Sequence, residues 1–139
     1  MAGGGPVLGL DLGQSRIGVA ISDPDCRVAV PIGTIRTGAP EDVKAIAALV
    51  KEHAVTRIVV GHPISLSGKA GEAADHAEKF ADALHGFLGV DVVLHDERLS
   101  TVEAERRLGG AGVKRRAQRE VIDQTAAVVI LQSYLDGLS

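Results

Sequence analysis

The N-terminal third of the chain alternates between apolar runs and short polar turns, a pattern typical of antiparallel strands. Residues 7–23 consist of two apolar runs separated by a turn at Gly13, which predicts a hairpin. A cluster of turn-forming residues at 22–25 then leads into a third strand within residues 26–35. Pro31 lies inside this strand and favours a sheet edge or a bulge, because proline donates no ladder hydrogen bond.

The remainder of the chain alternates helical and strand patterns. A helix after Pro40 carries an apolar stripe formed by Val43, Ile46, Ala47 and Val50. The apolar run 56–61 predicts a buried parallel strand, and residues 90–94 predict another. Between them, a helix that ends near Gly86 or Gly89 has an apolar stripe formed by Ala73, Ala77, Phe80, Leu84 and Phe87.

The C-terminal segment begins with a capping box at 100–103, which predicts a helix through Leu108. Residues 109–118 combine glycines with a basic cluster and predict a mobile segment. A last helix follows over 119–135. Antiparallel strands followed by alternating strands and helices indicate one domain over 1–139, of α/β class, with a mixed sheet flanked by helices on both faces.

A carboxylate interrupts the first apolar run at Asp11. The two-residue period of a strand places Asp11 on one face with Val7 and Gly9, while Leu8 and Leu10 point to the other face. Burial of a carboxylate is costly unless it is paired or binds a metal ion. The alternative interpretation is that Asp11 caps the adjacent turn.

Acidic residues also occur at two later places in the chain, at the end of a strand and on the apolar stripe of a helix. Asp96 and Glu97 follow the last predicted strand. Asp123 lies near the start of the last helix, on the stripe of Ala126, Ala127 and Ile130 that we expect to face the sheet. A first-turn acid stabilised by the helix dipole is the alternative interpretation of Asp123.

Carboxylates from two strands and a helix that converge on one sheet edge would form an oxygen-rich site suited to Mg²⁺ or Mn²⁺. Substrates of such sheets bind at the carboxyl ends of the strands. Two ions roughly 4 Å apart would serve phosphodiester hydrolysis, one by activating water and the other by stabilising the leaving oxygen. Such chemistry needs no serine, cysteine or histidine nucleophile.

The formal net charge is −3, but basic residues are concentrated in residues 98–119. Candidates for phosphate contact are Lys69, Arg98, Lys114, Arg115 and Arg116. A solvated charged face is the alternative interpretation. Aromatic residues make up only 2% of the chain, which argues against a platform for base stacking and favours recognition by shape.

Cys26 is the single cysteine, so no intramolecular disulfide can form and we expect an ordinary thiol. The N-terminus shows no signal-peptide pattern, and no apolar run has the length of a membrane span. These features predict a cytoplasmic protein that does not contact membranes.

Several motifs together resemble the YqgF/RuvX family. They are 9–13 (GLDLG), 16–20 (RIGVA), 59–63 (VVGHP), Gly68, 96–104 (DERLSTVEA) and 123–127 (DQTAA). Proteins of this family are RNase H-like and are regarded as Holliday junction resolvases and as nucleases for the 5′ end of pre-16S rRNA. The resemblance covers almost the whole chain and implies an RNase H-like five-stranded sheet.

The resemblance also implies a catalytic, metal-binding trio of Asp11, Glu97 and Asp123 with one or two Mg²⁺ or Mn²⁺ ions. Asp96 is then a structural or supporting partner of Glu97, since neighbours on a strand point to opposite faces. The family's loop commonly reads Gly-Leu-Pro, whereas this chain has His62. We expect His62 to be satisfied by loop backbone, with contact to substrate or metal as the alternative.

Three functions remain open from the sequence. The first is a metal-dependent nuclease that processes pre-rRNA, or alternatively resolves four-way DNA junctions as a homodimer, because a resolvase cuts two symmetric strands. The second is an actin-like ATPase or sugar kinase, which shares the Gly-x-Asp-x-Gly hairpin but needs two such domains. The third is a nucleic-acid-binding module without catalysis, against which the presence of all three acids argues.

Overall fold

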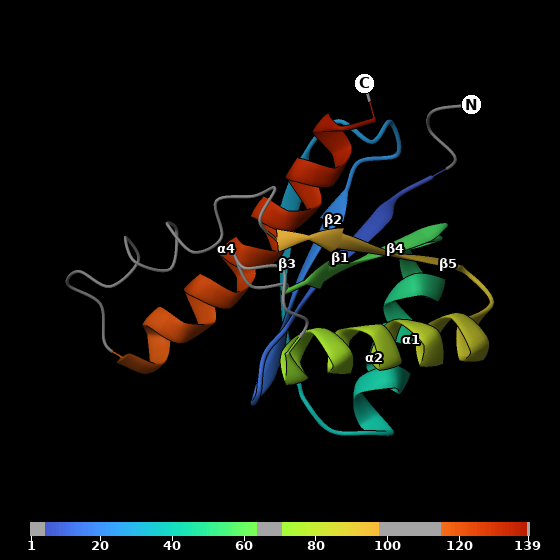
Figure 1. Cartoon of the computed structure of the whole chain (residues 1–139). Coiled ribbons are helices and arrows are strands. Elements are labelled where there is room, and N and C mark those ends of the chain that lie inside the picture. The colour runs from blue at the N-terminus through green and yellow to red at the C-terminus, as the bar shows by residue number, and fades with distance from the viewer. Residues whose placement is uncertain (1–4, 64–70, 98–114, 139) are drawn as a thin grey trace.

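One mixed five-stranded sheet forms the centre of the molecule, with the strand order β3-β2-β1-β4-β5 (Figure 1). The computed structural model describes residues 5–63, 71–97 and 115–138, and only the backbone of residues 115–124. The strands are β1 (Val7–Leu12), β2 (Arg16–Ser22), β3 (Ala29–Arg36), β4 (Arg57–His62) and β5 (Asp91–Asp96). The helices are α1 (Glu41–His53), α2 (Glu72–Leu88) and α4 (Arg115–Asp136).

The pairing of the strands confirms the predicted mixed sheet. β1, β2 and β3 pair antiparallel, whereas β4 runs parallel to both β1 and β5. β3 lies at the sheet edge, and its register against β2 shifts where Val19 pairs with Gly33 but Ala20 pairs with Pro31. Ile32 is the additional residue, so Pro31 lies both at an edge and beside a bulge, as its missing N–H predicts.

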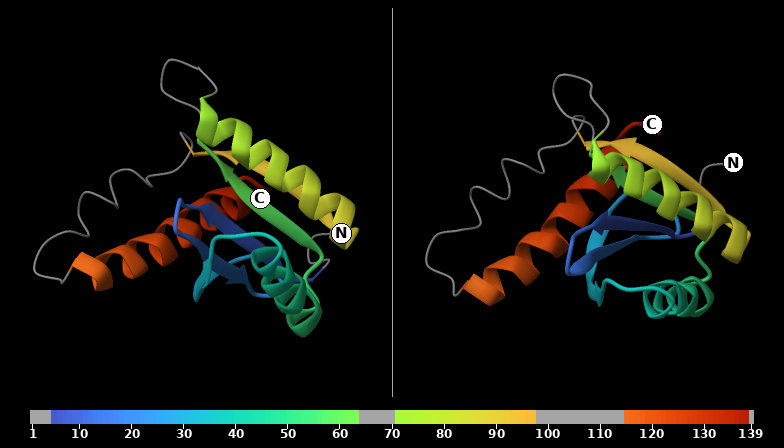
Figure 2. Two further views of the ribbon diagram at one scale, coloured as in Figure 1. Left: turned by 90° about the horizontal axis from the view of Figure 1, so that it is seen from below. Right: turned by 60° about the horizontal axis from the view of Figure 1, so that its bottom comes forward.

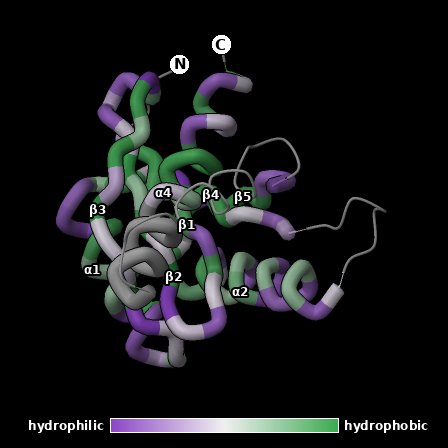
Figure 3. Tube along the Cα trace, turned by 90° about the vertical axis from the view of Figure 1, so that its left-hand side faces the viewer, coloured by the Kyte–Doolittle hydropathy of each residue, from purple (hydrophilic) through white to green (hydrophobic). Residues whose placement is uncertain are grey.

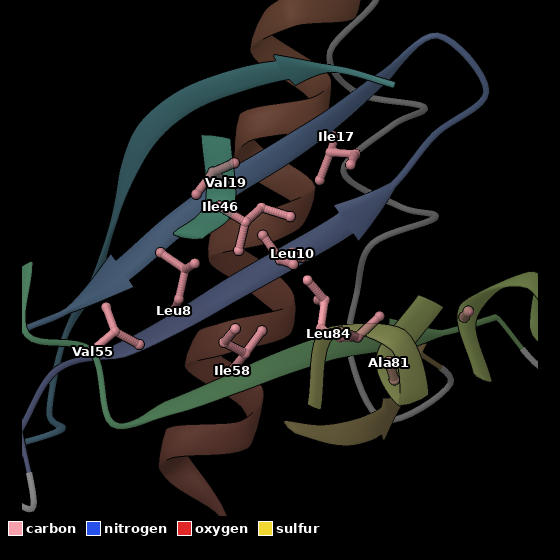
Figure 4. Close-up of a cluster of buried hydrophobic side chains, with 11 residues drawn as sticks. Leu8, Leu10, Ile17, Val19, Ile46, Val55, Ile58, Ala81 and Leu84 are labelled. Atoms are coloured by element: carbon pink, nitrogen blue, oxygen red, sulfur yellow. The ribbon is translucent and has the colours of Figure 1, made fainter. Parts of the chain in front are cut away.

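Helices cover both faces of the sheet (Figure 2). On one face, α1 and α2 pack over large aliphatic side chains from the central strands, among them Leu8, Leu10 and Ile58 (Figure 4). Ile46 of α1 and Leu84 of α2 are fully buried in the same cluster. The core is therefore aliphatic, as the shortage of aromatic residues requires.

On the other face, α4 packs over smaller residues. Ala126, Ala127, Ile130 and Leu131 are fully buried against Val7, Ala20 and Val59. A Cβ at Gly9 would lie only 2.7 Å from Cβ of Leu131, so the absence of a side chain at Gly9 allows the helix to approach β1 closely. The alternation of Val7 and Gly9 with Leu8 and Leu10 between the two faces confirms the predicted strand period.

Two helical predictions need correction. α4 begins at Arg115 rather than near residue 119, so residues 115–118 are helical and not a mobile loop. α2 buries Ala74, Ala77, Ala81 and Leu84, whereas Phe87 is 71% exposed and Ala73 is exposed. Figure 3 shows hydrophobic and hydrophilic positions interleaved along α2, as expected of a helix with one buried face.

The C-terminus of α2 behaves as predicted, because Gly89 takes the left-handed conformation (φ 72°) and its N–H donates to the carbonyl of His85. The helix predicted over 100–108, the other residues of the basic segment before position 115, and Lys69 lie outside the described residues. Within the described part of the chain, no helix has the length and apolar character needed to cross a membrane.

Candidate active site

Asp11 lies in the fifth position of β1, on the face of the sheet that α4 covers. Its side chain is only 2% exposed. Asp11 pairs with Gly18 of β2. On the other side, Leu10 pairs with Val60 of β4, so the next residues, Asp11 and Gly61, are also side by side. Asp11 therefore lies between two glycines, Gly18 on β2 and Gly61 on β4, which add no side chain on either side of it. Its place inside the sheet, rather than in the turn, argues against the turn-capping interpretation.

Glu97 reaches the same region from the other side of β4. It follows β5 directly, and its Oε2 lies 3.2 Å from the position that a Cβ on Gly61 would occupy. The Glu97 carboxylate thus lies against β4, the strand that separates β5 from β1. Because adjacent strands are about 4.8 Å apart, the carboxylates of Asp11 and Glu97 gather on one face near the carboxyl ends of β1 and β4.

Asp96 occupies the opposite face of the sheet. It pairs in register with His62 of β4. His62 Nε2 donates a hydrogen bond of 2.9 Å to Oε2 of Glu78 in α2, so this pair of positions faces α2 rather than α4. The structure therefore places Glu97, and not Asp96, on the face of Asp11.

His62 departs from its predicted environment. We expected satisfaction by loop backbone, but its partner is the carboxylate of Glu78. The sequence gives no indication of this contact, because it joins the end of a strand to a helix sixteen residues later. His53, His76 and His85 are exposed on helices, as predicted.

Asp123 lies in α4, and only its backbone is described. Ile130 Cδ1 lies 2.7 Å from the Cβ position of Gly61, and Leu131 lies over Gly9. Position 123 precedes Ile130 by about two helical turns and Ala127 by about one. Because the C-terminal half of α4 lies over the starts of the strands, its N-terminal half runs towards their carboxyl ends, which is the end of the sheet where Asp11 and Glu97 are found.

His95 borders the site and was not singled out by the sequence. It pairs with Gly61 and so lies in the same row as Asp11. Its Nε2 is joined to Oγ of Ser133 in α4 by a hydrogen bond of 2.9 Å, and its ring meets that of Tyr134 edge to face. Burial lowers the pKa of His95, an effect that the charge of Asp96 opposes. Burial therefore favours the neutral form of the imidazole.

Gly61 belongs to the motif 59–63, but the sequence assigned it no role in the site. It lies on β4, the strand between β1 and β5, and a side chain there would contact both Glu97 and Ile130. Its place at the end of an apolar run was visible in the sequence, but its neighbours depend on the pairing of β1 with β4.

The described side chains contain no group of three His, Cys, Asp or Glu residues that could hold a metal ion. The predicted trio includes Asp123, whose side chain is not described. Lys69, Arg98 and Lys114 lie outside the described residues, and Arg115 and Arg116 form the first turn of α4. The N-terminal turns of α4 extend beyond the strands (Figures 1 and 2).

The arrangement defines a class of fold. A solved structure of RuvC from T. thermophilus in complex with a Holliday junction substrate superimposes with a TM-score of 0.55 at 15% identity, over 93% of this chain and 92% of that chain. RuvC of Thermus thermophilus in a second structure gives a TM-score of 0.52 over 96% of this chain and 95% of that chain. The fold is therefore RNase H-like, of α/β class.

The sequence comparison identifies the family. The family model described as "RuvX: Holliday junction resolvase" matches residues 5–137. This chain belongs to the RuvX family.

Curated relatives cover nearly the same length. One from Chloroflexus aggregans is 49% identical over 94% of this chain and 93% of its own length. Another from Myxococcus xanthus is 50% identical over 94% of this chain and 87% of its own length. Both are named "Putative pre-16S rRNA nuclease".

Proposed function

We propose that this protein is a divalent-metal-dependent endonuclease that hydrolyses phosphodiester bonds and processes the 5′ end of pre-16S rRNA in ribosome biogenesis. The observation that carries the proposal is the pair of carboxylates, Asp11 and Glu97, on one face of an RNase H-like sheet, with glycines beside them. The names of the relatives support the RNA substrate. A role in the processing of pre-rRNA would place the protein in the cytoplasm, together with the assembling ribosome.

The residues present fit a hard divalent cation. Mg²⁺ and Mn²⁺ prefer carboxylate oxygens, and Asp11 and Glu97 supply them on one face of the sheet, where the neighbouring Gly18 and Gly61 add no side chain. Together with Asp123 from α4, these residues would hold one or two ions. A bound ion would activate water and stabilise negative charge on the phosphate oxygens.

The chain's own contribution is to fix the carboxylates before substrate arrives. Asp11 is buried in a strand that is paired on both sides, so its position is set by the sheet. Glu97 is held across Gly61. Preorganised charges of this kind are most effective where they need not rearrange during the reaction.

Nucleic acid would be recognised chiefly by phosphate contacts. The candidates are Lys69, Arg98, Lys114, Arg115 and Arg116. Of these, Arg115 and Arg116 belong to the turns of α4 that extend beyond the sheet. Phosphate contacts are electrostatic and independent of sequence, so shape would select the substrate.

The test compares cleavage of a pre-16S rRNA 5′ fragment and of a four-way DNA junction in Mn²⁺. We expect Asp11→Asn to abolish cleavage, at least 100-fold below wild type, while folding and nucleic acid binding are retained. Asp96→Asn is the matched control, because it removes the neighbouring carboxylate from the opposite face and should leave cleavage within about threefold of wild type. Undiminished cleavage by Asp11→Asn would reject the assignment and favour a site elsewhere.

The alternative substrate is a four-way DNA junction, supported by the description of the RuvX family model. A junction resolvase makes two symmetric cuts and therefore requires a homodimer. Preferential cleavage of the RNA fragment by a monomer supports the rRNA proposal, whereas paired symmetric cuts in the junction by a dimer support the alternative. Binding of both substrates without cleavage would indicate a module that has lost catalysis.

A further inference from the structure

Among the strands that the structure describes, β5 lies at the edge of the sheet and pairs with β4 alone. In the described part of the chain, polar side chains join β5 and α4 at two places. At the start of β5, Asp91 accepts a hydrogen bond of 3.3 Å from Arg57 Nη2, and Arg57 Nη1 donates to the Tyr134 hydroxyl at 2.7 Å. At its end, His95 is hydrogen-bonded to Ser133.

His95 and Glu97 lie on the same face of the sheet, because His95 is hydrogen-bonded to Ser133 of α4 and the Glu97 carboxylate lies at Gly61 beside Ile130 of the same helix. His95 pairs with Gly61, the residue against which the Glu97 carboxylate lies. The His95–Ser133 hydrogen bond therefore attaches the chain to α4 two residues before Glu97. Ser133 belongs to the helix that also carries Asp123, so this bond connects the two elements on which Glu97 and Asp123 are found.

We infer that His95 is a positioning residue for the nuclease site: through its hydrogen bond to Ser133 it fixes the end of β5 against α4 and thereby sets the position of Glu97 relative to Asp123. The inference rests on the proposed function, because Glu97 and Asp123 are metal-binding residues only in that proposal. His95 itself contacts neither metal nor substrate in this role.

A separate attachment at the start of β5 distinguishes positioning from simple structural support. The contacts of Asp91, Arg57 and Tyr134 hold the beginning of the strand, and Val93 packs in the cluster beneath α4. Loss of the His95 bond should therefore leave the strand in place and change only the placement of its end. A displacement of about 1 Å at a catalytic group can lower the rate by orders of magnitude.

The experiment measures two quantities for each variant: Mn²⁺ affinity by calorimetry in the absence of nucleic acid, and kcat and KM for the substrate that wild type cleaves. His95→Phe keeps a ring against Tyr134 but removes the nitrogen. We expect it to weaken Mn²⁺ binding about fivefold, the factor of one ordinary hydrogen bond, and to lower kcat at least fivefold. KM for nucleic acid should change less than twofold.

A pair of amide variants provides the matched control. Gln places its amide nitrogen as many bonds from Cβ as the Nε2 of histidine, whereas the Asn amide is one bond shorter. We expect His95→Gln to restore Mn²⁺ affinity and kcat to within about twofold of wild type, and His95→Asn to resemble His95→Phe. Ser133→Ala should reproduce the loss, and the double variant with His95→Phe should be no worse than either single variant.

Tyr134→Phe is the control for the other end of the strand, because it loses the hydrogen bond from Arg57 and keeps the ring beside His95. We expect it to reduce stability without changing Mn²⁺ affinity. The inference would be overturned if His95→Phe kept the Mn²⁺ affinity and kcat of wild type, or if His95→Gln and His95→Asn showed equal losses. In either case, loss of cleavage in Asp11→Asn would still support the proposed function. Full cleavage by Asp11→Asn would overturn the function itself.

Discussion

Gly61 carries the strongest steric constraint at the residue scale. An added Cβ would lie 2.7 Å from Cδ1 of Ile130 and 3.2 Å from Oε2 of Glu97. The first contact involves the end of a flexible side chain, which can rotate, whereas the second displaces a carboxylate that we propose binds the metal ion. A substitution at Gly61 should therefore lower the cleavage activity more than it lowers the stability of the fold.

We expect Gly61→Ala to lower kcat at least tenfold while it reduces the free energy of unfolding by about 1 kcal/mol. The double variant Gly61→Ala/Ile130→Val removes the contacting Cδ1 and should recover much of the stability but little of the activity. Urea unfolding and cleavage rates measure the two effects. Recovery of full activity in the double variant would show that displacement of Glu97 is not the cause.

Gly9→Ala is the matched control for this experiment. Its Cβ would meet Cβ of Leu131 at 2.7 Å, an atom fixed to the helix backbone that cannot rotate away. We expect a larger loss of stability than for Gly61→Ala, about 2–3 kcal/mol. The activity of the folded fraction should fall less than in Gly61→Ala.

At the scale of elements, the turn between β2 and β3 depends on Asp23. Its Oδ1 accepts hydrogen bonds from the backbone N–H groups of Arg27 (2.7 Å) and Val28 (2.9 Å). These bonds, chiefly that from Val28, hold the pKa of Asp23 below its ordinary value of 3.8. Because the folded-state pKa is the lower one, the carboxylate stabilises the fold above pH 3.8, and this contribution is lost as the pH falls through the folded-state pKa.

We expect Asp23→Asn to be less stable than wild type near pH 6, with the difference diminishing as the pH is lowered below 3.8. Thermal unfolding as a function of pH measures this difference. Asp25→Asn, in the same turn and with the same change in charge, is the control and should show a smaller difference at pH 6. A difference for Asp23→Asn that persists unchanged at the lowest pH would contradict the assigned role of the charge.

The elements that local periodicity specifies were predicted correctly, and the errors have physical causes. In α2, small alanines on adjacent stripes make the spacing ambiguous, and Leu88, which is partly buried, packs against the core in place of the exposed Phe87. In α4, the first turns extend beyond the sheet and carry no apolar stripe, so the pattern gave no sign that the helix begins at Arg115.

In the candidate site, the features that depend on residues close in the sequence could be predicted, whereas those that depend on contacts between distant segments could not. The position of Asp11 within β1, on the face of Gly9, follows from the strand period, as does the opposition of Asp96 and Glu97. The place of Gly61 beside Asp11 depends on parallel pairing of β1 with β4, which are separated by a helix. The His95–Ser133 bond joins residues 38 positions apart and has no local signature.

At the scale of the whole molecule, the contribution of the basic residues 114–116, of which Arg115 and Arg116 begin α4, can be tested through the salt dependence of nucleic acid binding. Replacement of Lys114, Arg115 and Arg116 by alanine should weaken nucleic acid binding and reduce the slope of log K against log salt by about 2, the value for three phosphate contacts on a single strand. Filter binding at several salt concentrations measures the slope.

The matched control removes three lysines from the helices on the opposite face. Lys44, Lys51 and Lys79 lie exposed on α1 and α2, so their replacement changes the net charge equally without altering α4. We expect binding and its salt slope to remain close to wild type. Equal slopes in both triple variants would show that total charge, and not this part of α4, governs binding.

The close approach of Leu131 to Gly9 has a mechanical consequence for α4. The C-terminal half of the helix lies within a side chain's thickness of β1 and is joined to the start of β3 by Gln132, which accepts from the N–H of Ala29 and donates to the carbonyl of Arg27. Sliding of this half along the sheet is blocked. Because this half is fixed, a displacement of the N-terminal turns would have to be taken up by bending of α4 on the N-terminal side of Ile130, the residue that lies beside the Glu97 carboxylate at Gly61.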